Sequence, residues 1–287
     1  MMTNQQAAEL GRLIQVAMDL YVSDPTSLAP TLNHPWLSPW KIAGYLTATD
    51  CIWRSGKTVL PGSEVCYGFL AESDPGVFVA VIRGTDGIVE WIEDGDFVSV
   101  SHPEAGHVEA GFWGIYSSMQ YRPLAGAAAP AAQGIAAAVG TGSVTVIGHS
   151  LGSALATYLT FDLARADRLG SRAQGCFWAS PRPGDADFAN AFDARVASYQ
   201  LRNYSLDVVP RVPFGDGYTA LPKATLIETD EAQARISFGL ACGHHLLSYL
   251  AMMNYDLTDW KAVPSIDQSC AACIKGPSTS KAQLCTS

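Results

Sequence analysis

Residues 142–163, GSVTVIGHSLGSALATYLTFDL, decide how this chain is interpreted. A β-branched apolar run up to Ile147 predicts a strand, and apolar residues at helical spacing from Leu151 onward predict a helix. Between them, the pattern Gly-His-Ser-Leu-Gly predicts that Ser150 lies on a sharp strand-to-helix turn. Ser150 is therefore either an exposed nucleophile or a cap of the helix that follows.

The composition excludes several classes of protein. Of the 287 residues, 48% are hydrophobic and 16% are charged, which indicates a globular chain. The formal net charge is −9, and no basic run is longer than two residues. This argues against binding of nucleic acid and against electrostatic attraction to anionic membranes, and it leaves neutral substrates open. No apolar run reaches the roughly 18 residues of a membrane-spanning helix.

The two ends of the chain differ in character. Residues 4–22 predict an amphipathic helix, and no positively charged segment ahead of an apolar core indicates a signal peptide. The tail, residues 262–287, holds three of the seven cysteines: Cys270, Cys273 and Cys285. They are either free thiols or part of a disulfide that pins the tail. A zinc site would need further ligands at suitable spacing, so we expect no metal.

Strand-like and helix-like segments alternate along most of the chain. This alternation predicts an α/β fold with a mostly parallel central sheet and helices on both faces, in a single domain of residues 1–287. The strand-like runs are residues 40–49, 64–73, 76–84, 143–147, 175–180 and 198–205, and the helix-like runs are 106–120, 124–140, 151–168, 185–196 and 244–253.

A serine nucleophile needs a base and an acid, which in α/β hydrolases both follow the serine in the chain. Only two of the six histidines lie after Ser150, so His244 or His245 would be the base. The residues alone do not choose between them, and both could also be a polar helix start.

Several carboxylates could serve as the acid. Asp207 follows a predicted strand and precedes a proline-rich loop, which puts it at the sheet edge where α/β sites assemble. Asp185 and Asp187 follow the preceding strand and are alternatives, whereas Asp193 falls within a predicted helix and is expected to face solvent. Asp207 is the preferred candidate.

The oxyanion of an ester hydrolase needs hydrogen-bond donors. One is the backbone N–H of Leu151, directly after the serine. The strand 76–84 ends in Arg83-Gly84-Thr85, so Thr85 is positioned to offer a second N–H. The other interpretation of Thr85 is a turn residue or a helix cap.

Six segments in sequence order resemble the class 3 lipase family, the fungal-lipase-like branch of the α/β hydrolases. The resemblance spans residues 46–253 and rests on VIRGTDGIVEWIED, GHVEAGFWGIY, VTVIGHSLGSALA, FWASPRPGDADFA, RNYSLDVVPRVP and HHLLSYL. It implies a carboxylester hydrolase, and family members are commonly secreted. Localisation therefore stays open between the cytoplasm and the mature form of a secreted enzyme.

The resemblance also implies roles for particular residues. Ser150 would be the nucleophile, Asp207 the acid, and Thr85 with Leu151 the oxyanion hole. His244 would be the base, because the family pattern of histidine, four residues, then tyrosine fits His244 and Tyr249. Residues 86–94 would form a helical lid, with apolar contacts from Ile88, Val89, Trp91 and Ile92; a docked surface helix is the alternative.

Two further positions depart from the family pattern. Ser153 replaces a common glycine, and Glu109 stands where many members have histidine. The expected activity is hydrolysis of acylglycerols or similar lipid esters without a cofactor, with a possible lipid–water interface and an unknown oligomeric state. A soluble short-chain esterase and a non-catalytic homologue acting as a binding module are the alternatives.

Overall fold

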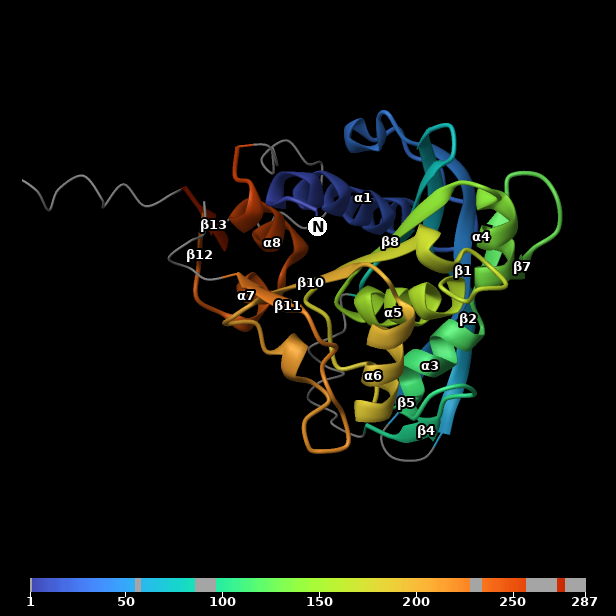
Figure 1. Ribbon diagram of the computed structural model, residues 1–287. Helices are drawn as coiled ribbons and strands as arrows, with labels where there is room; N and C mark the ends of the chain where they lie inside the picture. The colour runs from blue at the N-terminus through green and yellow to red at the C-terminus, as the bar shows by residue number, and fades with distance from the viewer. Residues whose placement is uncertain (1, 55–57, 86–96, 228–233, 257–272, 277–287) are drawn as a thin grey trace, which may run out of the picture.

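The computed structural model describes residues 2–54, 58–85, 97–227, 234–256 and 273–276 (Figure 1). The predicted lid, residues 86–94, and most of the predicted tail lie outside the described residues. The helices of four or more residues are α1 (Asn4–Ser23), α3 (Ala110–Ser117), α4 (Ala131–Val139), α5 (Leu151–Leu163), α6 (Ala186–Arg195), α7 (Leu240–His244) and α8 (Leu246–Met253). The strands are β1 (Lys41–Arg54), β2 (Thr58–Asp74), β3 (Val77–Ile82), β4 (Ser99–Ser101), β5 (His107–Glu109), β6 (Gln120–Pro123), β7 (Ala129–Pro130), β8 (Ser143–His149), β9 (Ala173–Trp178), β10 (Tyr199–Tyr204), β11 (Ala224–Ile227), β12 (Arg235–Ile236) and β13 (Ile274–Lys275).

The main sheet is mixed. Among the described residues it has nine strands in the order β11-β10-β9-β8-β3-β2-β1-β6-β7. Pairing is parallel from β3 through β8, β9 and β10 to β11, and antiparallel from β3 through β2, β1 and β6 to β7. The predicted α/β fold is confirmed, and its parallel strands form the core of the sheet. β2 and β3 are antiparallel because a tight turn joins them.

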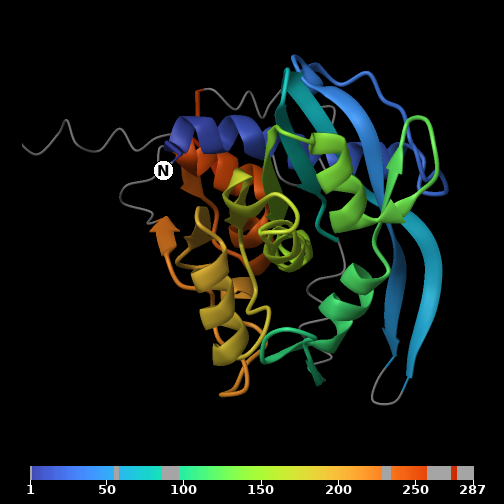
Figure 2. The ribbon, with the colours of Figure 1, turned by 45° about the vertical axis from the view of Figure 1, so that its right-hand side comes forward.

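Helices cover both faces of this sheet (Figures 1 and 2). α1 and α8 pack on one face, and α3, α4, α5 and α6 lie on the other. The side chains of β3 alternate accordingly: Val79 and Val81 join the core under α1 and α8, whereas Ala80 and Ile82 join the opposite core. A strand buried on both faces explains the unbroken apolar run in the sequence.

The parallel register brings the loops after several strands to one edge. Ile82 at the end of β3 pairs with Gly148 near the end of β8, and His149 pairs with Trp178 at the end of β9. The turns that contain Gly84 and Ser150 therefore leave the sheet side by side. The loop after β10, which contains Asp207, leaves from the same edge.

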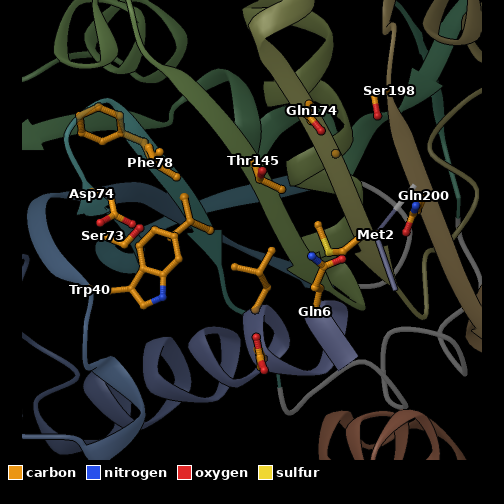
Figure 3. Close-up of a pocket in the computed structure, with 15 residues that line it drawn as sticks. Met2, Gln6, Trp40, Ser73, Asp74, Phe78, Thr145, Gln174, Ser198 and Gln200 are labelled. Atoms are coloured by element: carbon orange, nitrogen blue, oxygen red, sulfur yellow. The ribbon is translucent and has the colours of Figure 1, made fainter. Parts of the chain in front are cut away.

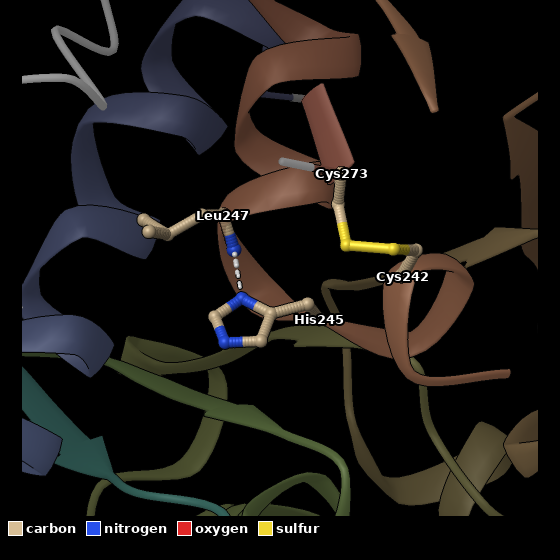
Figure 4. Close-up of a disulfide and its surroundings, with 4 residues drawn as sticks. All are labelled: Cys242, His245, Leu247 and Cys273. Carbon is tan, nitrogen blue, oxygen red and sulfur yellow. Dashed lines mark hydrogen bonds between the residues drawn. A yellow bond between two sulfur atoms is a disulfide. The ribbon is translucent and has the colours of Figure 1, made fainter. Parts of the chain in front are cut away.

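A disulfide joins a described part of the tail to the body of the protein (Figure 4). Cys242 in α7 is bonded to Cys273, and the backbone N–H of Ser237 donates to the Cys273 carbonyl over 2.8 Å. Next to this link, Ile236 of β12 pairs with Ile274 of β13. Of the two interpretations of the tail cysteines, a pinning disulfide therefore holds for Cys273.

No helix in the described ranges is both long and apolar enough to cross a membrane. Within the same ranges, no group of three or more His, Cys, Asp or Glu side chains is arranged to hold a metal ion.

Candidate active site

Ser150 occupies a strained turn between β8 and α5. Its backbone has φ 60° and ψ −130°, a conformation that non-glycine residues rarely adopt. The side chain makes no capping hydrogen bond to α5. Ser150 thus stands at the N-cap position of α5, but its hydroxyl does not cap the helix and is directed elsewhere.

The two glycines of the turn are required by close backbone contacts. A Cβ on Gly148 would lie 2.2 Å from the carbonyl oxygen of Gly152, and a Cβ on Gly152 would lie 2.5 Å from that of Arg83. Strand, helix and the loop after β3 therefore meet without room for a side chain. This contact explains why the pattern has glycine on both sides of the serine.

A continuous hydrogen-bond chain joins the three residues predicted to act together. His244 Nε2 lies 2.8 Å from Ser150 Oγ, and His244 Nδ1 lies 2.9 Å from Asp207 Oδ2. Because the carboxylate can only accept from Nδ1–H, Nε2 is left to accept the serine proton. The geometry is that of a serine whose proton can pass to a base.

Asp207 is buried and held by further donors. Tyr249 donates its hydroxyl to Asp207 Oδ2 over 2.7 Å, and the backbone N–H of Val209 donates to Oδ1 over 3.0 Å. The Tyr249 oxygen in turn accepts from the backbone N–H of Tyr204 over 2.9 Å. Burial, followed by the charge of Asp207, raises the pKa of Tyr249 well above its ordinary value, so Tyr249 stays a donor. The spacing from His244 to Tyr249 in the sequence did not reveal this contact with the acid.

The alternative acids take part in other interactions. Asp185 caps α6 by accepting from the backbone N–H of Phe188 over 2.9 Å, and Asp187 lies in the first turn of that helix. Asp193 forms an ion pair of 2.5 Å with Lys223. Among the described residues, the carboxylate bonded to His244 is that of Asp207.

The adjacent histidines have different positions. His245 is the N-terminal cap of α8, and its Nδ1 accepts from the backbone N–H of Leu247 over 3.2 Å (Figure 4). His149, which the sequence did not single out, donates from Nε2 to the backbone carbonyl of His244 over 2.8 Å. Burial lowers the pKa of His149 well below its ordinary value, with the charges of His244 and His245 adding to the effect, so it remains neutral. It links the serine turn to the backbone that carries His244.

The loop after β3 packs against the serine turn. A Cβ on Gly84 would lie 3.1 Å from the carbonyl oxygen of His149 and 3.5 Å from the Cβ of Ser150. Thr85 follows directly and is partly buried, and Leu151 is the first residue of α5. Both candidate oxyanion donors are therefore next to Ser150 in the chain or in space, as the parallel register requires.

The two departures from the family pattern are both buried. Ser153 Oγ lies 2.7 Å from the carbonyl oxygen of Gly148 and 2.6 Å from that of Trp178, so it links the ends of β8 and β9. Glu109 caps α3, where its Oε2 accepts from the backbone N–H of Phe112 over 2.7 Å. Glu109 is 0% exposed, and burial raises its pKa to about 7.

A hollow of about 670 Å³ lies away from these residues (Figure 3). Its lining includes Gln6 of α1, Trp40, Val77 at the start of β3 and Ser198 just before β10. Val77 and Ser198 mark the amino-terminal ends of two parallel strands, whereas Ser150 follows the carboxyl end of β8. The hollow is thus at the opposite edge of the sheet from the candidate site.

A strained serine turn after a parallel strand, with histidine and acid supplied by later loops, is the arrangement of the α/β-hydrolase class. Comparison with known proteins narrows the class. Residues 79–217 match the family model Lipase (class 3). This matched stretch carries Ser150 and Asp207 and is similar to the class 3 lipase family.

Individual proteins are also similar to this chain. Phospholipase A1-II 6 of Oryza sativa subsp. japonica is 34% identical over 185 residues, which are 54% of this chain and 44% of that protein. A lipase of Rhizomucor miehei is 31% identical over 147 residues, 50% of this chain and 39% of that protein. The solved structure of lipase II from Rhizopus niveus is similar in fold, with a TM-score of 0.57 at 24% identity over 78% of this chain and 80% of that one. This chain spans less than half the length of the two curated relatives.

Proposed function

We propose that this protein is a serine carboxylester hydrolase that cleaves acyl chains from lipid esters. One observation carries the proposal: the hydrogen-bond chain from Ser150 Oγ through His244 to buried Asp207, with Ser150 in a strained turn. The similarity to the class 3 lipase family supports it, because the curated relatives carry the names phospholipase A1 and lipase. We also propose that residues 1–287 form one catalytic domain.

The reaction follows from the roles of the side chains. Ser150 Oγ attacks the ester carbonyl carbon while His244 Nε2 takes the serine proton, and Asp207 keeps the resulting imidazolium oriented and stabilised. Negative charge develops on the carbonyl oxygen, where the N–H groups of Thr85 and Leu151 donate. His244 then returns the proton to the leaving alcohol. Water repeats the sequence to release the fatty acid, and no metal or organic cofactor takes part.

A covalent probe tests the nucleophile. A fluorophosphonate should label the wild-type protein on Ser150, since the phosphorus is attacked only by a serine that a base has activated. Ser150→Ala should abolish labelling. Thr157→Ala, which removes a buried hydroxyl in α5, should retain it. A wild-type protein that is not labelled would favour the non-catalytic homologue and overturn the proposal.

The substrate class is tested by comparing esters. A lipid hydrolase should cleave p-nitrophenyl esters from butyrate to palmitate at comparable or rising rates, and it should release fatty acid from phosphatidylcholine or triacylglycerol emulsions. The net charge of −9 favours these zwitterionic and neutral lipids over anionic ones. A steep fall in rate beyond butyrate would instead identify a soluble short-chain esterase.

A further inference from the structure

Arg83 is a buried arginine directly before the candidate oxyanion residues. It ends the β3 run, is 3% exposed, and donates from its backbone N–H to the carbonyl of Tyr67 over 2.8 Å. Its guanidinium carbon lies 3.7 Å from the ring centroid of Tyr21 and 4.5 Å from that of Tyr67. Two aromatic faces therefore enclose the cation, an arrangement that stabilises it without a counter-ion.

Arg83 forms no ion pair within the described residues, where nine pairs join other side chains. Its side-chain donors go to carbonyl oxygens: Nε to Cys66 over 2.9 Å and a terminal nitrogen to Gly84 over 2.9 Å. A buried charge without a carboxylate is costly for stability. Holding these two segments together would not by itself require a charge, because a neutral side chain can also donate to a carbonyl.

The bond to Gly84 has a specific consequence. The carbonyl of Gly84 and the N–H of Thr85 belong to one planar peptide group. A cation that bonds the oxygen draws electron density from the group, which makes the N–H at its other end a stronger donor. The same bond fixes the rotation of the peptide plane, and hence the direction of the Thr85 N–H.

We propose that Arg83 is the positioning residue of the oxyanion hole: its guanidinium polarises and orients the Gly84–Thr85 peptide so that the Thr85 N–H stabilises the tetrahedral intermediate. The proposal rests on the proposed function. The C=O and N–H of a trans peptide point in opposite directions, so Arg83 on the Gly84 oxygen acts through the peptide and need not contact the substrate. The N-terminal helix takes part, because Tyr21 of α1 stacks on the guanidinium.

A trifluoromethyl ketone with an alkyl chain measures this effect directly. Ser150 Oγ would add to its carbonyl carbon, the serine proton would pass to His244, and the carbonyl π bond would open to leave an oxyanion. The oxyanion donors stabilise both the transition state of ester hydrolysis and the adduct with the ketone. KM for a soluble butyrate ester reflects binding before the oxyanion forms, so it does not depend on these donors. The expected signature is a parallel change in kcat and in the inhibition constant.

Arg83→Met removes the cation and should lower kcat about 10- to 100-fold, with KM within about twofold of wild type. The inhibition constant of the ketone should rise by the same factor. Arg83→Lys retains a cation and a donor, so its kcat and inhibition constant should lie between those of wild type and Arg83→Met. If Arg83→Met does not fold, the lysine variant alone should still show the parallel change.

Arg202→Met is the matched control. Arg202 is also buried and pins α1, donating to Met2 O over 2.9 Å and to Asn4 Oδ1 over 2.5 Å. Its loss should lower the melting temperature and leave kcat and the inhibition constant unchanged. The proposal is overturned if the folded Arg83 variants lose only thermal stability, or if KM rises in step with the inhibition constant. Failure of fluorophosphonate to label the wild type would instead remove the proposed function itself.

Discussion

The two sides of the candidate site are built in opposite ways. Ser150 lies between a central strand and a buried helix, and every residue of α5 except Asp162 is buried. His244 ends the five-residue helix α7, whose first residue, Leu240, is 59% exposed and which follows Phe238, 98% exposed. The first side is part of the core, and the second is attached to it.

Three long-range contacts compensate for the missing core around His244. The disulfide Cys242–Cys273 lies two residues before it, His149 bonds its backbone carbonyl, and Asp207 bonds its ring. The difference teaches that the serine is positioned by folding itself, whereas the histidine is positioned by a few separable links. Changes on the serine side should therefore affect folding, and changes on the histidine side should affect rate.

The largest effect is expected at the paired histidines. His244→Ala should lower kcat about 10⁶-fold, as loss of the base does when it acts as a unit with the nucleophile. His245→Ala should keep most activity, because the Nδ1 of His245 accepts from the backbone of α8 and not from Ser150, and it should cost about 1 kcal/mol of stability. Hydrolysis of a soluble butyrate ester and thermal melting measure the two effects. The reverse ranking would assign the base to His245.

The glycines test whether the serine side depends on folding. Gly148→Ala would force a Cβ to within 2.2 Å of the Gly152 carbonyl oxygen, and we expect a loss of about 3 kcal/mol or more in the free energy of unfolding. Gly243→Ala, on the histidine side, places its Cβ 3.7 Å from the nearest atom. Its stability should change by less than about 1 kcal/mol. Chemical denaturation measures both, and equal losses would erase the contrast between the two sides.

The disulfide tests whether the histidine side is held by separable links. Replacing Cys242 and Cys273 together by serine should lower kcat about 10- to 100-fold, since small misplacements of a catalytic group are costly. Hydrogen exchange should rise in residues 237–245 and stay slow in β8 and α5. Treating wild type with dithiothreitol, which reduces the bond to two thiols, should reproduce the loss, while the double variant should not respond. Unchanged activity would show that the other two links suffice.

The last effect concerns the pH dependence of stability. Burial raises the pKa of Glu109 to about 7, from 4.5 in an exposed chain, so the folded protein holds a proton that the unfolded chain releases. Stability should therefore fall as pH rises from about 4.5 to about 7, by up to about 3 kcal/mol. Glu109→Gln keeps an oxygen for the N–H of Phe112 and removes the titration. Its stability relative to wild type should be greater at pH 8 than at pH 5; a constant difference would contradict the assigned cause.

Much of the fold was predictable because it is local in the sequence. The β-branched run to Ile147 and the helical spacing from Leu151 are confirmed as β8 and α5, and the strand-like runs 64–73 and 76–84 are confirmed as β2 and β3. The antiparallel half of the sheet was not predicted, because an apolar run does not reveal the direction of its neighbours. The predicted lid, residues 86–94, lies outside the described residues and stays a prediction.

The residues alone fixed one side of the site more firmly than the other. Residues 142–163 predict a serine on a tight turn between two glycines. The structure gives the reason: a Cβ on Gly148 or Gly152 would lie too close to a neighbouring carbonyl oxygen. The residues alone could not separate His244 from His245, because the two are chemically identical neighbours. In the fold, His244 ends α7 with its ring toward Ser150, whereas His245 caps α8 with its ring toward Leu247. Tertiary structure likewise decided three other contacts: the disulfide from Cys242, the hydrogen bond from His149 to His244, and the packing of Arg83 on Tyr21. Each joins residues that are distant in the sequence and meet only in the folded protein.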